Sequence, residues 1–392
     1  MIKAFAVCNY RSLKEIVSPL SDLNVVTGSN GSGKSNLYKC LRLLSETAKG
    51  NLISSLANEG GLDYAFWAGP ESFTRDMQSG LAPIQGSAKK SSSRLKLGFV
   101  TENFGYSISL GLPPPPDGAN PDPSMFHLDP EIKRECIWAG EYYRPASCLV
   151  DRTGSIAKVR SGRKWEIYTG HLNSYESILS EISDPVSVPE VYEIRQLVRG
   201  WRFYDQFRTD SSSPVRISQI GTRTPVLDHD GHCLVAALRT IYEIGDRDAL
   251  FESIEDAFPG ASISFSADEG NRFSLEFNQV GLLRPLKQAE LSDGTLRYLL
   301  LVAALLTPRP PPLLVLNEPE TSLHPDLLPA LGRLISRVSK ETQVWVVSHA
   351  SRLVATLEKD IDCNSIQIDK KLGETFICDQ GLLDSPPWYW PD

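Results

Sequence analysis

A glycine-rich loop near the amino terminus constrains the fold of this chain more than any other feature. Residues 28–35 read Gly-Ser-Asn-Gly-Ser-Gly-Lys-Ser and match the pattern G-x-x-x-x-G-K-[ST]. The apolar run Leu23–Thr27 predicts a strand before the loop, and a leucine repeat predicts a helix over Asn36–Glu46 after it. A loop in this position can wrap backbone N–H groups around phosphate at the helix N-terminus. The pattern therefore predicts a P-loop domain that binds a nucleotide.

The residue types within this loop suit a nucleotide phosphate and its magnesium ion. Glycines let the backbone N–H groups curl around phosphate, and Lys34 adds a positive charge near the β- and γ-phosphates. Ser35 offers a hydroxyl ligand to Mg²⁺. The candidate phosphate-binding residues are Asn30, Gly31, Ser32, Gly33, Lys34 and Ser35. The alternative is a glycine-rich turn with a stray lysine, which the flanking strand and helix disfavour.

An apolar strand that ends in acidic residues is the second feature. Residues 313–320 read Leu-Leu-Val-Leu-Asn-Glu-Pro-Glu, the arrangement of a Walker B strand. Such a strand lies beside the phosphate loop and delivers a carboxylate to the metal shell or to the attacking water. Many strands end in Glu-Pro, so this feature gains its meaning from the phosphate loop.

Two further segments fit the same pattern. Residues 291–295 read Leu-Ser-Asp-Gly-Thr and precede an apolar helix, so Ser292 and Gly294 would lie at a helix N-terminus, which favours phosphate. His349 follows a strand expected over Gln343–Val347 and can hydrogen-bond a γ-phosphate. Taken alone, the first segment reads equally well as a helix cap, and a histidine after a strand is more often structural.

Along the chain the phosphate loop comes first, then the segment 291–295, the acidic strand and His349. Four features in this order resemble the ABC-type ATPases and more closely their RecF, SMC and OLD-like branch. In that branch the acidic strand continues as E-P-E-x-S-L-H-P, and Glu318–Pro325 matches this pattern. The segment Asn9–Leu13 before the phosphate loop is also similar to that branch. The segments Trp201–Asp205 and Gly221–Leu227 resemble the middle of a group of stand-alone bacterial predicted ATPases of the AAA family. The likeness covers most of the chain.

The resemblance implies a single ABC-type ATPase head over residues 1–392, an α/β P-loop fold. Helices and strands alternate in the last third of the chain, which predicts a mixed, mostly parallel sheet flanked by helices. Residues about 85–215 predict an inserted antiparallel β lobe with a helical segment. Residues 216–392 would hold the signature, the Walker B strand and the histidine loop.

The resemblance also implies ATP and Mg²⁺ as ligands and assigns roles position by position. Lys34 and Ser35 would hold phosphate and Mg²⁺, and Glu318 would polarise the attacking water. His349 would sense the γ-phosphate in the same subunit. An arginine near the N-terminus often touches the nucleotide in this branch, which makes Arg11 a candidate.

In the same family the signature contacts the nucleotide of a second subunit. Ser292 and Gly294 would therefore contact the γ-phosphate bound by another copy of the chain, and ATP would close a homodimer. The family's Q-loop glutamine has no clear counterpart, because Gln78 and Gln85 both lie in the right region and neither has a convincing context.

Asn317 departs from the Walker B pattern, which has aspartate at this position. An amide still accepts a hydrogen bond from a metal-bound water but contributes no charge. One interpretation is a slow ATPase in which Glu318 alone supplies the carboxylate, and the other is a switch that binds ATP and barely hydrolyses it. The intact Glu318 favours slow hydrolysis.

Charge and composition limit the partners. The formal net charge of −8 argues against a general phosphate-binding surface, so any DNA contact would be local. The seven cysteines are scattered without a C-x-x-C pair, which suits a reducing cytosol. The longest apolar run, Leu299–Leu306, is too short to span a bilayer. We therefore expect a cytoplasmic protein that does not bind membranes.

Two functions remain open at this point. The resemblance suggests a DNA-associated ATPase in DNA repair or antiviral defence, and cleavage of DNA would need a partner nuclease. The alternative is an ATP-dependent regulatory switch that controls a partner effector protein without acting on DNA.

Three other segments have a structural and a functional interpretation. Asp228–Cys233 carries two histidines and a cysteine, and we favour a capping loop before a helix over a metal site. For the aromatic and basic residues of Trp201–Arg208 we favour a packed strand over a nucleic-acid stacking face. The aromatic tail Ser385–Asp392 either packs on its own domain or docks a partner.

Overall fold

The computed structural model describes residues 1–81, 83, 94–114, 125–378, 380–381 and 385–391. The chain forms two compact units, and each is described by itself. The first unit comprises Met1–Leu20, Gly28–Gly200 and Ile366–Asp392, and the second comprises Ser21–Thr27 and Trp201–Ser365. The chain therefore passes from the second unit to the first between Thr27 and Gly28.

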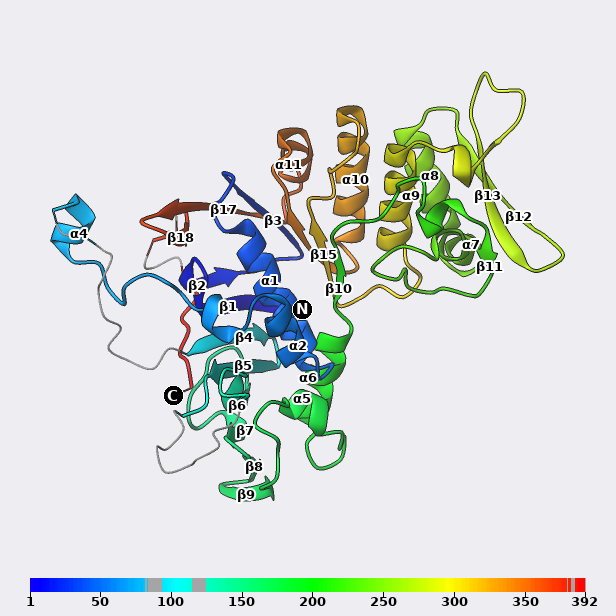
Figure 1. Ribbon diagram of the computed structural model, residues 1–392. Coiled ribbons are helices and arrows are strands. Elements are labelled where there is room, and N and C mark those ends of the chain that lie inside the picture. Colours follow the sequence, from blue (N-terminus) through cyan, green and yellow to red (C-terminus); the bar gives the residue numbers. More distant parts are fainter. Residues whose placement is uncertain (82, 84–93, 115–124, 379, 382–384, 392) are drawn as a thin grey trace. The chain divides into compact units, whose positions relative to one another are not determined.

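An eight-stranded antiparallel sheet forms the centre of the first unit (Figure 1). Its order is β2-β1-β4-β5-β6-β7-β8-β9. The strands are β1 (Ile2–Tyr10), β2 (Leu13–Pro19), β4 (Leu95–Thr101), β5 (Phe104–Gly111), β6 (Glu131–Ala139), β7 (Cys148–Thr153), β8 (Ile156–Ser161) and β9 (Lys164–Thr169). Most residues of β1, β4 and β5 are buried, including at least four in succession in each strand, so this part of the sheet is covered on both faces.

Helices α1 and α6 pack against this sheet, beside β1, β4 and β5. The helices of the unit are α1 (Lys34–Thr47), α2 (Leu52–Asn58), α3 (Leu62–Ala65), α4 (Arg75–Ser79), α5 (Ile178–Glu181) and α6 (Pro189–Arg199). The leucine repeat of α1 places Leu37, Leu41 and Leu44 on one buried face. A hairpin of β17 (Cys363–Lys371) and β18 (Glu374–Ile377) follows late in the chain, and its first three residues belong to the second unit.

The prediction of a mostly parallel sheet is wrong for this unit. Its sheet is antiparallel throughout, and the amino-terminal strands β1 and β2 belong to it together with the strands after residue 94. Only two residues separate β1 from β2, and a connection that short joins antiparallel strands, whereas parallel strands need a long crossover. Within the region expected to form an antiparallel β lobe, β4 and β5 form an antiparallel hairpin.

The second unit contains the parallel sheet that the sequence predicts. Its strands are β10 (Arg202–Tyr204), β15 (Leu313–Asn317), β16 (Gln343–Val347) and β3 (Leu23–Gly28), in this spatial order. β3 reaches its last residue, Gly28, in the first unit. Asn317 pairs with Val347 in the register, and Val347 pairs with Val26, so the carboxyl ends of three strands lie at one edge.

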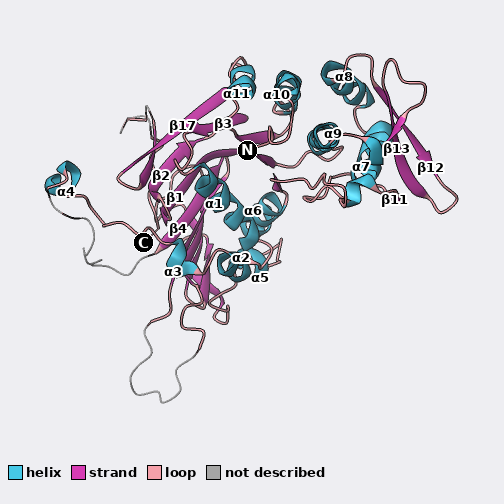
Figure 2. Ribbon diagram, turned by 45° about the horizontal axis from the view of Figure 1, so that its top comes forward, coloured by secondary structure: helices cyan, strands magenta, loops and turns pink. Residues whose placement is uncertain are grey.

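Helices and a small sheet complete this unit (Figure 2). The helices are α7 (Leu234–Ile244), α8 (Arg247–Ala257), α9 (Asp293–Leu305), α10 (Leu328–Val338) and α11 (Ser351–Leu357), with short 3₁₀ turns at Pro214–Arg216, Gln288–Glu290 and Pro325–Leu327. The small antiparallel sheet contains β11 (Gln219–Ile220), β12 (Ser262–Ala267), β13 (Arg272–Asn278) and β14 (Leu286–Lys287).

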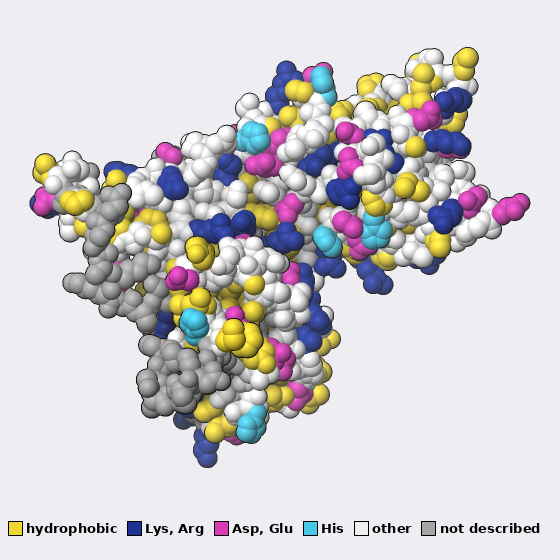
Figure 3. Space-filling view, in the orientation of Figure 1, with side chains coloured by type: hydrophobic (Ala, Val, Ile, Leu, Met, Phe, Trp, Pro, Cys, Tyr) yellow, Lys and Arg dark blue, Asp and Glu magenta, His cyan; other side chains and the backbone are white. Residues whose placement is uncertain are grey.

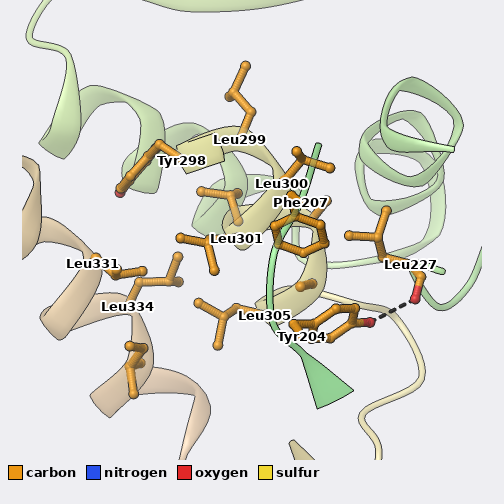
Figure 4. Packing of buried hydrophobic residues seen from close by; sticks show 14 of the residues in the cluster. Tyr204, Phe207, Leu227, Tyr298, Leu299, Leu300, Leu301, Leu305, Leu331 and Leu334 are labelled. Carbon is orange, nitrogen blue, oxygen red and sulfur yellow. Dashed lines mark hydrogen bonds between the residues drawn. The ribbon is translucent and has the colours of Figure 1, made fainter. Parts of the chain in front are cut away.

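The core of the second unit surrounds α9, which is buried along most of its length. Every residue of α9 from Leu296 to Leu305 is buried, because α7, α8 and α10 pack against it. Figure 4 shows Leu300, Leu301 and Leu305 of α9 packed among aromatic and leucine side chains. This helix begins at the segment that the sequence marks as a signature, so the core fixes the position of that segment.

Candidate functional site

The glycine-rich loop lies between a strand and a helix, as the sequence predicts. β3 ends at Gly28, and α1 begins at Lys34 with Gly33 as its N-cap residue. Gly33 has φ 114°, a conformation that favours glycine, and a Cβ atom there would lie 2.3 Å from Oγ1 of Thr375. Only glycine therefore allows the loop to enter the helix along this path.

Lys34 is turned inward in this structure. Its side chain is buried, and Nζ donates hydrogen bonds to the backbone oxygens of Gly28 (2.7 Å) and Ser29 (3.1 Å). Asn30 and Ser35 are exposed on the loop surface. The ammonium group thus sits within the curl of the loop, where a phosphate would be a stronger, charged acceptor than the two carbonyls.

Two side chains that the sequence analysis missed brace the loop. Thr375 of β18 is buried, and its Oγ1 lies 2.6 Å from the backbone oxygen of Ser32 and 2.7 Å from Oγ of Ser12. Nδ2 of Asn36 donates to the same Ser12 hydroxyl over 2.8 Å. Ser12 lies inside the Asn9–Leu13 motif, so part of that motif supports the phosphate loop. Thr375 lacks any sequence signal.

Arg11 is partly buried and paired with an acidic side chain. Its Nη2 lies 3.1 Å from Oε2 of Glu59, and its backbone N–H donates to the oxygen of Ala65 over 2.7 Å. The hydroxyl of Tyr10 donates to the same Glu59 carboxylate. Burial, together with the charge of Glu59, raises the pKa of Tyr10. The guanidinium of Arg11 is therefore fixed by Glu59 at the end of α2.

The Walker B strand of the second unit ends as the sequence predicts. β15 finishes at Asn317, whose Oδ1 is buried and receives no hydrogen bond from the described residues. Glu318 follows with φ 47°, a left-handed conformation that is rare for a glutamate. Its backbone N–H donates to the oxygen of Val347 over 2.8 Å. The turn that carries Glu318 is thus strained and anchored to the neighbouring strand.

Arg297 of α9 is a further anchor of this turn. Its side chain is 3% exposed, and Nη2 donates to the backbone oxygens of Asp205 (3.1 Å) and Glu318 (3.4 Å). Burial lowers the pKa of Arg297, and the charge of Glu320 acts in the opposite direction. Arg297 therefore links the helix that follows the signature to the backbone of Glu318. The sequence analysis missed this residue because its contacts are tertiary.

Glu320 organises the residues after β16. Its Oε1 accepts hydrogen bonds from Oγ of Ser348 (2.8 Å) and from the backbone N–H of His349 (2.9 Å). Nδ1 of His349 lies 3.2 Å from the same oxygen, while the ring remains half exposed. The other carboxylate oxygen of Glu320, Oε2, is buried and has no hydrogen bond among the described residues.

The signature segment lies at the start of α9. Ser292 is the N-cap residue, and its Oγ accepts the backbone N–H of Thr295 over 3.1 Å. A Cβ atom on Gly294 would lie 3.1 Å from the backbone oxygen of Ser322, so this glycine faces the turn after the acidic strand. Arg216 holds the segment by donating to the oxygen of Leu291 over 2.7 Å. Ser292 can therefore cap α9 and still expose its hydroxyl to a ligand.

The structure thus gathers the candidate residues into two sets. Asn317, Glu318 and His349 meet at the carboxyl edge of the parallel sheet, in the second unit. The phosphate-loop residues lie in the first unit. Along the chain they directly follow β3, which is a strand of the parallel sheet. The expected Q-loop glutamines add nothing: the side chain of Gln78 and all of Gln85 lie outside the described residues.

The donor atoms at the sheet edge suit Mg²⁺. Oδ1 of Asn317 and Oε2 of Glu320 are buried oxygens without hydrogen-bond donors among the described residues. Hard oxygen donors of this kind are the ligands that Mg²⁺ prefers. The residues present therefore fit a magnesium ion.

Two of the segments with a structural interpretation are resolved by burial. Trp201, Phe203, Tyr204 and Phe207 are all buried, which confirms a packed strand rather than a stacking face. The aromatic tail packs on its own unit: Trp388 contacts Trp138 edge-to-face, with ring centroids 5.9 Å apart. The aromatic patterns therefore serve packing.

Comparisons with known proteins agree with this geometry. Residues 172–355 match the family described as "AAA domain, putative AbiEii toxin, Type IV TA system", and residues 1–99 match the family described as "AAA ATPase domain". No curated protein sequence matches the chain.

Solved structures of SMC head domains are similar over nearly the whole chain. An SMC head bound to the C-winged helix domain of ScpA superposes with a TM-score of 0.50 at 14% identity, over 96% of each chain. An SMC head with an extended coiled coil, bound to the C-terminal domain of ScpA from Pyrococcus furiosus, gives 0.49 at 12% identity, over 96% of this chain and 95% of that one. The head of Thermotoga maritima gives 0.44 at 14%, over 96% and 97%.

At these identities the first similarity establishes the fold alone. The two family matches support an ATPase domain of the AAA family, and the first structure supports an ABC/SMC-like fold for it. Over the described residues, every helix is too short or too polar to cross a lipid bilayer.

Proposed function

We propose that this chain binds ATP with Mg²⁺ and hydrolyses it slowly. The observation that carries the proposal is the phosphate loop, which curls around the buried ammonium of Lys34. Backbone N–H groups at the start of α1 would hold the phosphates, with Asn30, Gly31, Ser32 and Gly33 in the loop and Ser35 as a metal ligand. Arg11, held by Glu59, is a candidate contact for the nucleotide.

The acidic edge of the parallel sheet would perform the chemistry. When bound, Mg²⁺ neutralises charge on the phosphates and orients them. Asn317 would contribute a neutral oxygen to its shell, and Glu318 would polarise the attacking water. His349, positioned by Glu320, would contact the γ-phosphate. The missing charge at Asn317 is the reason that we expect a slow reaction.

Binding and turnover separate the proposal from its alternatives. Lys34→Ala should abolish ATP binding, measured by equilibrium dialysis with labelled nucleotide. Glu318→Gln should bind ATP as the native protein does and release no phosphate. Turnover that is equal in the native protein and in Glu318→Gln would exclude hydrolysis at this site and leave an ATP-dependent switch.

We further propose that ATP closes a homodimer. Ser292 lies exposed at the N-terminus of α9, where backbone N–H groups favour an anion from outside the subunit. The mass of Glu318→Gln, measured by light scattering, should double when ATP is added and should not change with ADP. A constant mass under both conditions would contradict the dimer.

DNA association in repair or antiviral defence, in the cytoplasm, is the pathway that the family resemblance favours. Figure 3 shows basic and acidic side chains interspersed on the face in view, so a DNA contact would be local. Binding of duplex DNA should then fall steeply with salt, with a slope set by the few phosphates contacted. A partner nuclease would be needed to cut the DNA.

The second candidate is a switch that controls an effector protein, and one observation favours it. The family that matches residues 172–355 is described by a toxin of a toxin–antitoxin system. ATP-dependent co-purification of one protein, with DNA binding that is weak and insensitive to salt, would support the switch. Salt-sensitive DNA binding without such a protein would support the first candidate.

A further inference from the structure

The segment Asp228–Cys233 between β11 and α7 is fixed to the core of the second unit. The hydroxyl of Tyr204 donates to the backbone oxygen of Leu227 over 2.7 Å, as Figure 4 shows. Gly231 turns the chain with φ 73°, and a Cβ atom there would lie 2.5 Å from Cδ2 of Leu300. The segment is therefore held at both its start and its turn, so its side chains project from a rigid base.

The side chains of this segment do not cap α7, which corrects the interpretation that we favoured from the sequence. Cys233 is the N-cap residue and makes no side-chain capping bond. The backbone N–H of Leu234 instead donates to the oxygen of Gly231 over 3.2 Å. The polar side chains of Asp228 and His232 are thus left for another role.

Three of these side chains turn their ligand atoms toward one another. Oδ2 of Asp228 lies 3.5 Å from Sγ of Cys233 and 3.6 Å from Nε2 of His232, and all three atoms lie within 4.8 Å of one another. Tetrahedral Zn²⁺, with bonds of about 2.0–2.3 Å, separates oxygen, nitrogen and sulfur ligands by about 3.4–3.6 Å. Two edges of the triangle already have the lengths that such an ion requires.

The fourth side chain of the cluster orients the histidine. Oδ1 of Asp230 lies 2.7 Å from Nδ1 of His232 and also accepts the backbone N–H of that residue over 3.1 Å. A carboxylate on Nδ1 fixes the tautomer that leaves Nε2 free as a ligand, and it increases the basicity of the ring. This arrangement of ligand and supporting carboxylate is common around zinc.

The geometry points to a zinc site formed by Asp228, His232 and Cys233, separate from the nucleotide site. A carboxylate and a thiolate balance the two charges of Zn²⁺, and the neutral imidazole completes a mixed set that zinc accepts readily. Three protein ligands leave the fourth tetrahedral position to water, since Asp228 and His232 are about half exposed. Soft sulfur among the ligands disfavours Mg²⁺ and Ca²⁺.

Cobalt substitution in the full-length protein, freed of metal and nucleotide, tests the site. We expect one equivalent of Co²⁺ with tetrahedral d–d bands and a thiolate-to-cobalt band, and displacement of that cobalt by one equivalent of Zn²⁺. Cys233→Ser should lose the thiolate band. Asp230→Asn keeps all three ligands and should bind about 10- to 100-fold more weakly.

Cys363→Ser is the matched control, because Cys363 is also half-buried and has acidic neighbours but no histidine. It should keep both spectrum and affinity. The nucleotide site has no cysteine among its proposed residues, so cobalt bound there would give no thiolate band. An absence of cobalt uptake, an octahedral spectrum, or a thiolate band that survives in Cys233→Ser would overturn the proposal.

Discussion

The carboxylate of Glu320 accepts the backbone N–H of His349 over 2.9 Å and so joins the turn after β15 to the turn after β16. The same oxygen accepts the hydroxyl of Ser348, which is fully buried. Two neighbouring parallel strands can slide or splay at their ends unless such a link exists. Glu320 therefore sets where His349 stands relative to Glu318, whatever ligand the site binds.

Glu320→Ala should lower the free energy of unfolding by about 2 kcal/mol, because it leaves the buried hydroxyl of Ser348 and the partly buried backbone N–H of His349 without an acceptor. The urea midpoint of the native and variant proteins measures this. Asp326→Ala is the control. The carboxylate of Asp326, in the 3₁₀ turn that follows, is 75% exposed and pairs with Arg352 on the surface. Equal losses in the two variants would show that the buried link contributes nothing specific.

Arg297→Met should slow turnover by about 10- to 100-fold while ATP binding stays within a factor of two or three, because it frees the backbone of Glu318. This expectation depends on the proposed ATPase activity. Arg297 donates to the backbone oxygens of Asp205 and of Glu318, so it is a positioning residue. Arg297→Lys, which keeps a buried donor, should recover part of the rate.

Arg333→Met provides the comparison for this variant. Arg333 lies on α10 and pairs with Asp256 at the surface over 2.7 Å, so its loss should leave both binding and turnover unchanged. A parallel fall of binding and turnover in Arg297→Met would indicate a purely structural role instead.

The sequence predicted the local parts of this site well. The bounds expected for the strand Gln343–Val347 are those of β16, and the phosphate loop lies between β3 and α1. These features depend on periodicity and on short motifs, which neighbouring residues determine. The glycines of the phosphate loop likewise indicate the local backbone conformation.

Contacts between residues that are distant along the chain could not be predicted in this way. Thr375 contacts Ser12, which lies 363 residues away in the sequence, and no pattern near either residue predicts that contact. The antiparallel partners of β1 were missed for a similar reason, because alternation shows that a strand exists and not which strand it pairs with. In the sequence Arg297 is simply a polar residue in an apolar helix, because the backbone oxygens that accept its hydrogen bonds lie far from it along the chain.

Arg152→Met should lower the free energy of unfolding of the first unit by about 3–5 kcal/mol, because it leaves a buried carboxylate without its cation. Nη1 of Arg152 lies 3.2 Å from Oε2 of Glu135, and both side chains are 0% exposed. Glu135 also accepts the hydroxyl of Tyr106 and the backbone N–H of Ile178, so it joins the sheet to α5.

Thermal unfolding compares this variant with Arg134→Met, which breaks a partly exposed pair with Asp151 and should cost about 1 kcal/mol or less. Adding Glu135→Gln to Arg152→Met removes the uncompensated charge and should restore part of the loss. Similar destabilisation by the two single variants, or no recovery in the double variant, would contradict a dominant buried charge.

Trp388→Ala should destabilise the first unit by about 1–3 kcal/mol, because the tail covers the sheet with this side chain. Trp388 packs against Trp138 and lies over Gly98, where a Cβ atom would come within 2.6 Å of the Trp388 ring. Tyr389→Ala, at the next position and 64% exposed, should change the urea midpoint little. Gly98→Ala should also destabilise the sheet, because its Cβ atom would displace the Trp388 ring and would lie 2.8 Å from the backbone oxygen of Tyr106. The clash with Tyr106 remains when Trp388 is alanine, so the double variant should be less stable than Trp388→Ala. An unchanged urea midpoint in Trp388→Ala would contradict a stabilising role of the tail.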